Sequence, residues 1–127
     1  MHIDNYKKVA TSTASPYSLV KQLYESLEAY LDGAHQALKV NDPKSAHKSI
    51  DKSLSILGIL QEGLNKNIGG DLPKNLDDLY DYMKVTLIQA NSQKDLRLIE
   101  NVSATLKPIK SAWDEIPPES QNIKSQI

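Results

Sequence analysis

Three histidines are the first candidates for metal or phosphoryl chemistry in this 127-residue chain. They are His2, His35 and His47, and they are widely separated. A di-metal carboxylate bundle needs a Glu-x-x-His motif on two helices so that paired ligands project inward. That motif occurs nowhere in the sequence, and the absence of cysteine excludes disulfides and the common thiolate zinc sites. We therefore expect no metal site and interpret the histidines as solvated side chains.

The remaining polar clusters also do not form a catalytic site. Asp77, Asp78 and Asp81 lie together near the start of a predicted helix, where the helix dipole favours negative charge, and such a run is usually a solvated face. Met83 is suited to fill a core rather than to bind haem. Gly69-Gly70 indicates a turn, because no glycine-rich phosphate loop surrounds it. The sequence predicts a protein that is not an enzyme and has no cofactor.

One segment keeps a signalling function open. Residues 34–39, Ala-His-Gln-Ala-Leu-Lys, loosely resemble the phosphohistidine segment of histidine phosphotransfer domains, His-x-Leu-Lys-Gly. Here Lys39 comes one residue late, which turns it by roughly 100° relative to His35 on a helix. Val40 also stands where that family has a small residue. A histidine phosphotransfer bundle is therefore the alternative interpretation.

Composition limits the partners and the location. The net charge of -1 provides no basic surface for nucleic acid or anionic lipid. No stretch approaches the ~20 apolar residues of a membrane span, and residues 1–8 have no apolar run behind their charges. We expect a cytoplasmic protein that binds no nucleic acid and does not insert into the membrane.

The first half of the chain predicts two amphipathic helices. Residues 1–14 are polar and aperiodic, so we expect a mobile N-terminal arm. Ser15-Pro16 is a typical start, with serine as N-cap and proline in the first turn. Asn41-Asp42-Pro43 stops this helix and starts the next, with Asp42 as cap. Apolar residues recur at helical spacing in both segments. They are Leu19, Leu23, Leu27, Tyr30, Ala34 and Leu38, then Ala46, Ile50, Leu54, Leu57, Leu60 and Leu64.

The second half predicts two more helices. The third begins near Leu72-Pro73 and runs to about Ala90, followed by a break at Asn91-Ser92. The fourth has a heptad-like seam that contains Pro108, where we expect a bend. Its seam residues are Ile99, Val102, Leu106, Ile109, Trp113 and Ile116. The chain is therefore predicted to be an all-α, antiparallel up-down four-helix bundle over residues 15–116, with a polar C-terminal tail over residues 117–127.

The second and third helices have more apolar residues than one buried face requires. In the third, Leu76, Leu79, Tyr80, Met83 and Leu87 form one face, but Tyr82, Val85 and Ile88 fall outside it. In the second, Ile56 lies beside the core stripe and Ile59 nearly opposite its centre. We expect these five residues to line a groove for an amphipathic partner, with Leu60 and Met83 at its floor. The alternatives are that they fill gaps between helices or that the surface binds another copy of the chain.

An ordered series of motifs resembles the flagellin export chaperone family, the FliS-type flagellar secretion chaperones. The strongest match is residues 74–83, Lys-Asn-Leu-Asp-Asp-Leu-Tyr-Asp-Tyr-Met. Residues 13–16 with Leu19, Leu23 and Tyr24 resemble the opening of that family's first helix. Tyr6, Ala90-Asn91 and Ala112-Trp113 match further landmarks in the right order. The chain departs from the family at Tyr24-Glu25-Ser26, where Tyr-Asp-Gly is common, and at Lys84-Val85-Thr86, where basic residues are common.

This resemblance implies a non-enzymatic chaperone of bacterial flagellum biogenesis and protein secretion. Such proteins bind the disordered C-terminal segment of flagellin, prevent premature polymerisation and help deliver it to the export gate. From the residues themselves, we assign client binding to Ile56, Ile59, Leu60, Tyr82, Met83, Val85 and Ile88. Ile3 and Tyr6 are large apolar side chains in a polar arm, and we expect them to dock it onto the bundle. A self-associating structural bundle, or a weak homodimer, is the other use of such a surface.

Overall fold

Four α-helices make up the described part of the computed structural model, which covers residues 16–64 and 71–116. They are α2 (Pro16–Lys39), α3 (Pro43–Glu62), α4 (Leu72–Gln93) and α5 (Leu96–Asp114). Those two ranges contain no strand, so the all-α prediction is confirmed. The predicted arm, the predicted tail and the cap Ser15 lie outside the described residues.

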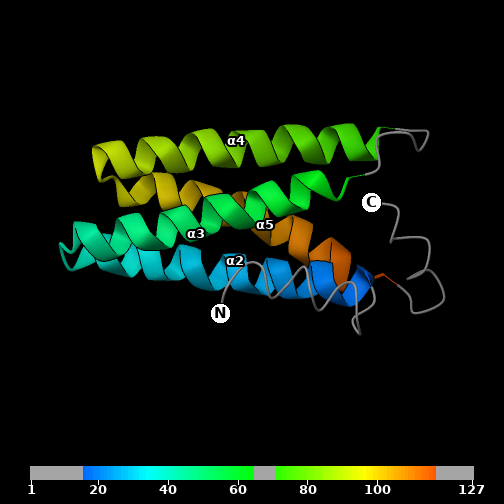
Figure 1. Ribbon diagram of the computed structural model, residues 1–127, viewed down its shortest axis with the longest axis horizontal. Helices are drawn as coiled ribbons and strands as arrows, with labels where there is room; N and C mark the ends of the chain where they lie inside the picture. Colours follow the sequence, from blue (N-terminus) through cyan, green and yellow to red (C-terminus); the bar gives the residue numbers. More distant parts are fainter. Residues whose placement is uncertain (1–15, 65–70, 117–127) are drawn as a thin grey trace.

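The helices form a ring in which each contacts the next in sequence, and α5 closes the ring against α2. In Figure 1, α2 and α4 lie on opposite sides, with α3 and α5 between them. The α2–α3 and α4–α5 turns lie at the left of that view, and we call this the turn end. The opposite end holds the first turns of α2 and α4 and the last turns of α3 and α5. We call it the cavity end.

The α2–α3 turn confirms the predicted cap. The Asp42 carboxylate accepts a hydrogen bond from the Ser45 backbone N–H at 3.2 Å, and Pro43 occupies the first turn of α3. Asn41 has a φ of 63°, the left-handed conformation that asparagine adopts more readily than most residues. Asn41, Asp42 and Pro43 therefore end one helix and start the next, as predicted.

The α4–α5 turn differs from the prediction. The expected break at Asn91-Ser92 is wrong, because both residues are helical and α4 continues to Gln93. The chain turns at Lys94, whose φ is 52°, and at Asp95, whose carboxylate accepts from the Arg97 N–H at 2.9 Å. Asparagine and serine are only weakly unfavourable inside a helix, whereas a capping side chain accepts a hydrogen bond from a backbone N–H that has no partner within the helix. The capping residue therefore decides the boundary.

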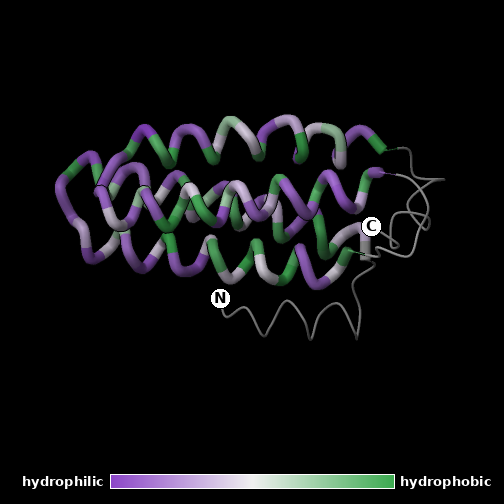
Figure 2. Tube along the Cα trace, turned by 90° about the horizontal axis from the view of Figure 1, so that it is seen from above, coloured by the Kyte–Doolittle hydropathy of each residue, from purple (hydrophilic) through white to green (hydrophobic). Residues whose placement is uncertain are grey.

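Apolar side chains from all four helices meet along the axis of the bundle. In Figure 2 hydrophobic and hydrophilic residues alternate along each helix, as amphipathic helices require. The centre of the core is aliphatic, with Leu27, Leu57, Met83 and Leu106 almost fully buried. None of the described helices is both long enough and apolar enough to cross a membrane.

Pro108 lies inside α5 rather than at its end. A proline there leaves the carbonyl four residues earlier, that of Ala104, without its helical donor. Ala104 and Pro108 are both exposed, so water can reach this carbonyl. The helix therefore keeps the proline on its outer face, where the lost hydrogen bond is least unfavourable. The bend expected at this position stays a prediction.

Candidate functional site

The outer face of α4 carries the exposed apolar residues that the sequence predicted. Tyr82 is 47% exposed, and Val85 and Ile88 are each 58% exposed. The prediction that these three side chains lie away from the core is confirmed. Their exposure is unusual on a helix whose other face is already buried, because a single apolar face is enough to anchor a helix.

These residues extend into a longer diagonal row that includes Leu79, which is 37% exposed. Each three-residue step turns back by roughly 60°, so the row slants at about 45° to the helix axis. It starts beside α5, since Leu79 lines a cavity between α4 and α5. It ends beside α3. Ile88 lies one helical turn after Lys84, and the Lys84 ammonium group donates a hydrogen bond to Gln61 of α3. We call Leu79, Tyr82, Val85 and Ile88 the α4 stripe.

Ile56 does not belong to a surface, so the prediction that it lines a groove is wrong. The side chain is fully buried in the core. It lies beside the central stripe of α3, as the spacing predicted, but α2 and α4 both pack against α3. A helix with two neighbours buries a wider arc than one stripe. A residue about 80° from the stripe centre is therefore covered.

The two predicted floor residues have different positions. Met83 is completely buried at the centre of the core and lines none of the described cavities, so its assignment as a groove floor is wrong. Leu60 is 6% exposed and lines a cavity together with the partly buried Ile59. That cavity faces α2 rather than the α4 stripe. Ile59 and Leu60 therefore stay together, but apart from Tyr82, Val85 and Ile88.

A polar network occupies the place where the predicted groove would run between α3 and α4. The Gln61 amide donates to the Asp77 carboxylate at 3.0 Å and to the Asp81 carboxylate at 2.8 Å. Lys84 donates to the Gln61 amide oxygen at 2.6 Å. These bonds hold the end of α3 against α4 with charged groups. The single groove expected from the sequence is therefore wrong, and the apolar residues divide into separate surfaces.

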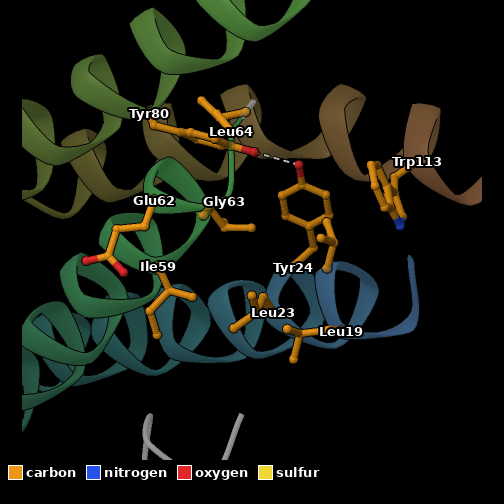
Figure 3. Close-up of a pocket in the computed structure, with 11 residues that line it drawn as sticks. Leu19, Leu23, Tyr24, Ile59, Glu62, Gly63, Leu64, Tyr80 and Trp113 are labelled. Atoms are coloured by element: carbon orange, nitrogen blue, oxygen red, sulfur yellow. Dashed lines mark hydrogen bonds between the residues drawn. The ribbon is translucent and has the colours of Figure 1, made fainter. Parts of the chain in front are cut away.

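The first cavity, pocket 1, lies at the cavity end between α2 and α3 and has a volume of about 260 Å³. Leucine, valine and isoleucine side chains of these helices form most of its walls, and Figure 3 shows the aliphatic side chains gathered around the centre. Tyr24, Tyr80 and Trp113 also line it, and Glu62 stands among the lining residues. No lysine or arginine is among the lining residues in the described part of the chain.

The second cavity, pocket 2, lies at the same end but between α4 and α5, and its volume is about 470 Å³. Because α4 and α5 form the side of the ring opposite α2 and α3, the two cavities are on opposite sides of the bundle. Across pocket 2, Leu72 and Leu79 of α4 face Ile109 of α5 and Ile116, which follows the end of α5. Leu72 and Leu79 are 52% and 37% exposed, so the rim of this cavity is itself apolar. Pocket 2 therefore continues directly into the α4 stripe.

A layer of aromatic side chains separates the two cavities. Tyr24 and Trp113 line both, and their rings meet edge to face with centroids 6.1 Å apart. Tyr17 also stacks on Trp113, with ring centroids 5.3 Å apart. The Trp113 indole N–H donates to the Tyr17 carbonyl, and the Tyr17 hydroxyl donates to the Trp113 carbonyl, each at 3.2 Å. These reciprocal bonds join the first turn of α2 to the last turn of α5.

Two buried hydroxyl groups meet in the same layer. The Tyr24 and Tyr80 oxygens are 2.6 Å apart, and both residues are 2% exposed (Figure 3). Burial raises the pKa of Tyr80 far above its ordinary value, and the nearby Tyr24 raises it further. Burial also raises the pKa of Tyr24, although the hydrogen bond with Tyr80 partly offsets this. Both hydroxyls therefore keep their protons at neutral pH.

The described histidines take part in contacts between and within helices. His35 on α2 lies 3.2 Å from the Glu100 carboxylate on α5. His47 on α3 contacts the Asn91 amide of α4 at 2.9 Å and the Asp51 carboxylate at 3.2 Å. Among residues 16–64 and 71–116, no three histidine or acidic side chains come together as metal ligands would. His2 lies outside the described residues.

The sequence reading missed most of the residues of pocket 2. The spacing predicts Leu79 on the core face, but the residue lies at the edge of that face, about 70° from its centre, and is partly exposed. The sequence pattern indicates only a helix start at Leu72. The heptad pattern predicts Ile109 and Ile116 in a buried seam, but both are only half-buried. A seam that stays half-exposed at one end is the signal that could have indicated a cavity there. Ile3 and Tyr6, predicted to dock the arm, lie outside the described residues.

Comparison with known proteins connects this geometry to a family. Residues 2–120 match the family model described as flagellar protein FliS. The flagellar secretion chaperone FliS of Vibrio cholerae is 37% identical over 93% of this chain and 90% of its own length. FliSB of Pseudomonas aeruginosa is 37% identical over 83% of each chain, and FliS of Bacillus subtilis is 28% identical over 87% of this chain and 81% of its own.

These relatives are named as chaperones, which are not enzymes, and the prediction that the chain is not an enzyme is thereby confirmed. The family-model match includes all the landmarks on which the resemblance rests, from Tyr6 to Trp113. A bundle with apolar cavities and an exposed apolar stripe suits a protein that covers another chain. The protein belongs to the FliS family of flagellar secretion chaperones.

Proposed function

We propose that this protein is a cytoplasmic export chaperone that binds the C-terminal segment of newly made flagellin. In this role it prevents the premature polymerisation of flagellin and delivers it to the flagellar export gate. The proposal rests on membership of the FliS family and on one structural observation. That observation is the continuity of pocket 2 with the α4 stripe, which offers one long apolar surface.

The shape of this surface suits a client that folds as it binds. A disordered segment loses conformational entropy when it is ordered, so it needs contacts spread over a large area. The α4 stripe rises by roughly 14 Å along the helix from Leu79 to Ile88, and pocket 2 extends it toward the cavity end. An amphipathic client helix can place apolar side chains along such a row, and its neighbouring extended part can fill the cavity.

The acidic residues beside the stripe add a charge preference. Asp78 and Asp81 precede Tyr82 and Val85 by one helical turn, so each carboxylate stands next to an apolar side chain of the stripe on the exposed face. Positive residues on the flank of the client would be favoured there, at a strength that falls with added salt.

The test compares two valines with nearly equal exposure. Val85 in the stripe is 58% exposed, and Val40 at the turn end is 60% exposed. We expect Val85→Asp to weaken binding of the flagellin C-terminal segment about tenfold, because it places a charge in the contact area. Val40→Asp should leave the affinity unchanged. Isothermal titration with the flagellin segment from the same organism measures both.

The Val40 variant is a strict control because aspartate near the C-terminus of α2 opposes the helix dipole. It should therefore reduce the melting temperature at least as much as Val85→Asp does. Equal loss of affinity in the two variants would mean that general destabilisation, and not the stripe, determines binding. If the wild-type protein shows no affinity for flagellin, the proposed client is wrong.

The arm forms the second part of the proposal. We propose that Ile3 and Tyr6 dock the N-terminal arm onto an apolar surface of the bundle, where they compete with the client. The motive is that both are large apolar side chains in an otherwise polar segment. Deletion of residues 1–10 should then raise client affinity, because an internal competitor is removed. The double substitution Ile3→Ser, Tyr6→Ser in the full-length chain should have the same effect. Unchanged affinity in both variants would contradict the arm's role.

A further inference from the structure

The Tyr24–Tyr80 pair is a polar feature within the otherwise mainly aliphatic lining of pocket 1. Both residues line the cavity, and their hydroxyl groups meet between its walls in Figure 3. Buried polar groups are usually hydrogen-bonded, and an unmatched donor is unfavourable. The number of hydroxyl protons in this pair therefore shows whether the pair needs a further hydrogen-bond acceptor.

Two tyrosine hydroxyls hold two protons, and the bond between them uses only one. If Tyr24 donates to Tyr80, the Tyr80 proton points elsewhere, and the reverse assignment leaves the Tyr24 proton. Within residues 16–64 and 71–116, no side chain or carbonyl accepts this second proton. The cavity, at about 260 Å³, is large enough for water, which can accept it in the free protein. A ligand that displaces this water must supply an acceptor of its own.

The lining of the cavity defines that ligand further. Its walls include Leu19, Leu23 and Ile59, which favour an aliphatic group. The described lining contains no basic side chain, so a carboxylate would find no counter-ion among these residues. The ligand should therefore combine a neutral hydrogen-bond acceptor with an aliphatic group. A peptide has this combination where a backbone carbonyl lies next to a leucine, isoleucine or valine side chain.

We propose that pocket 1 binds one aliphatic side chain of the exported client, and that the second tyrosine proton donates to the backbone carbonyl adjacent to it. This inference depends on the proposed flagellin-binding function and adds a subsite to it on the side of the bundle opposite pocket 2. Because Tyr24 also lines pocket 2, the same aromatic layer contacts the client from both sides.

Phenylalanine substitutions separate this role from a structural one. In Tyr24→Phe or Tyr80→Phe, the remaining hydroxyl still has a proton to donate, so client affinity should change by less than about threefold. In the Tyr24→Phe, Tyr80→Phe double variant no donor remains, and we expect about a tenfold loss, which is typical for one buried hydrogen bond.

Stability should follow the opposite order. Each single variant leaves a buried hydroxyl without its partner, whereas the double variant replaces both with apolar groups of similar shape. The single variants should therefore melt below the double variant, and only the double variant should bind weakly. A purely structural tyrosine pair would not produce this crossed pattern of melting temperature and affinity.

The affinity of the full-length protein for the flagellin C-terminal segment, measured by titration, tests the subsite. If the wild type binds the segment and the affinity of the double variant is within twofold of the wild-type value, the subsite is overturned and the proposed function stays intact. No binding by the wild type would overturn the proposed function together with the subsite.

A second variant keeps the test independent of the tyrosines. Val20→Trp places a large ring at the wall of pocket 1, and Ala29→Trp places the same ring at an exposed position on the same helix. The subsite requires at least a fivefold loss for Val20→Trp and none for Ala29→Trp at equal helicity. Equal affinities for these two folded variants would overturn it.

Discussion

The two ends of this bundle are built from different side chains. At the turn end the helices meet through small buried residues, Ala34, Ala37, Ala46 and Ala90. At the cavity end they meet through Tyr17, Tyr24, Tyr80 and Trp113. Small side chains let helix backbones approach closely, and short loops then suffice to connect them. Flat, rigid rings cannot fill all the space between splayed helix ends, and two apolar cavities remain beside them.

This difference shows how one fold combines stability with binding. The turn end supplies capped, tightly connected helices, with Asp42 and Asp95 accepting hydrogen bonds from the next helix. The cavity end supplies surface that a partner can enter. A protein whose core were closely packed at both ends would have no such space for a client, since well-packed interiors contain few voids.

The largest expected effect is on the aromatic layer. Trp113→Ala removes the ring that contacts Tyr17 and Tyr24 and also the indole N–H that joins α5 to α2. We expect a loss of about 3–5 kcal/mol in the free energy of unfolding, as for other buried aromatic truncations. Urea unfolding followed by circular dichroism measures it. A loss below about 1 kcal/mol would show that the layer does not hold the cavity end together.

Adding volume should distinguish the two ends more directly. Ala90→Leu at the turn end adds methylenes to a fully buried position and should destabilise by about 1–3 kcal/mol. Ala112→Leu at the exposed wall of pocket 2 has space available and should change stability by less than about 0.5 kcal/mol. Thermal unfolding of the two variants gives the comparison. Equal destabilisation at both positions would mean that the cavity end is packed as closely as the turn end.

The smallest expected effect concerns the caps. Hydrogen bonds from Ser45 lower the pKa of the Asp42 carboxyl, whereas Asp71 at the start of α4 makes no side-chain cap bond. A lowered folded-state pKa means that the stabilisation is complete above the ordinary value of 3.8 and is lost as pH falls through the lower value. Asp42→Ala should therefore lower the melting temperature at pH 7, and this difference should shrink near pH 2.

Asp71→Ala is the matched control for this measurement, because it removes a carboxylate from the same position of a helix at the cavity end. It should change the melting temperature less than Asp42→Ala does at pH 7. The opposite order would show that the turn-end cap contributes no more than an unbonded aspartate.

Periodicity predicted the helices and their order well, because each helix must bury an apolar face whatever its neighbours are. It also predicted that Tyr82, Val85 and Ile88 lie off the core. It failed for Ile56 and Met83, which were assigned to a surface and are completely buried. The reason is that a helical wheel describes one helix, whereas burial depends on how many neighbours surround it. The expected break at Asn91-Ser92 failed because a cap three residues later was more favourable.

The sequence by itself determined the four-helix bundle, the family and the surplus of apolar residues on α4. These follow from local spacing and from motifs that are read along the chain. Only the tertiary structure decided which cavity these exposed apolar residues adjoin. Gln61 closes the α3–α4 boundary with hydrogen bonds to residues sixteen or more positions away, and Tyr24 meets Tyr80 across 56 positions. Contacts between distant residues depend on the packing of whole helices, and the cavities that they border are defined only once all four helices are in place.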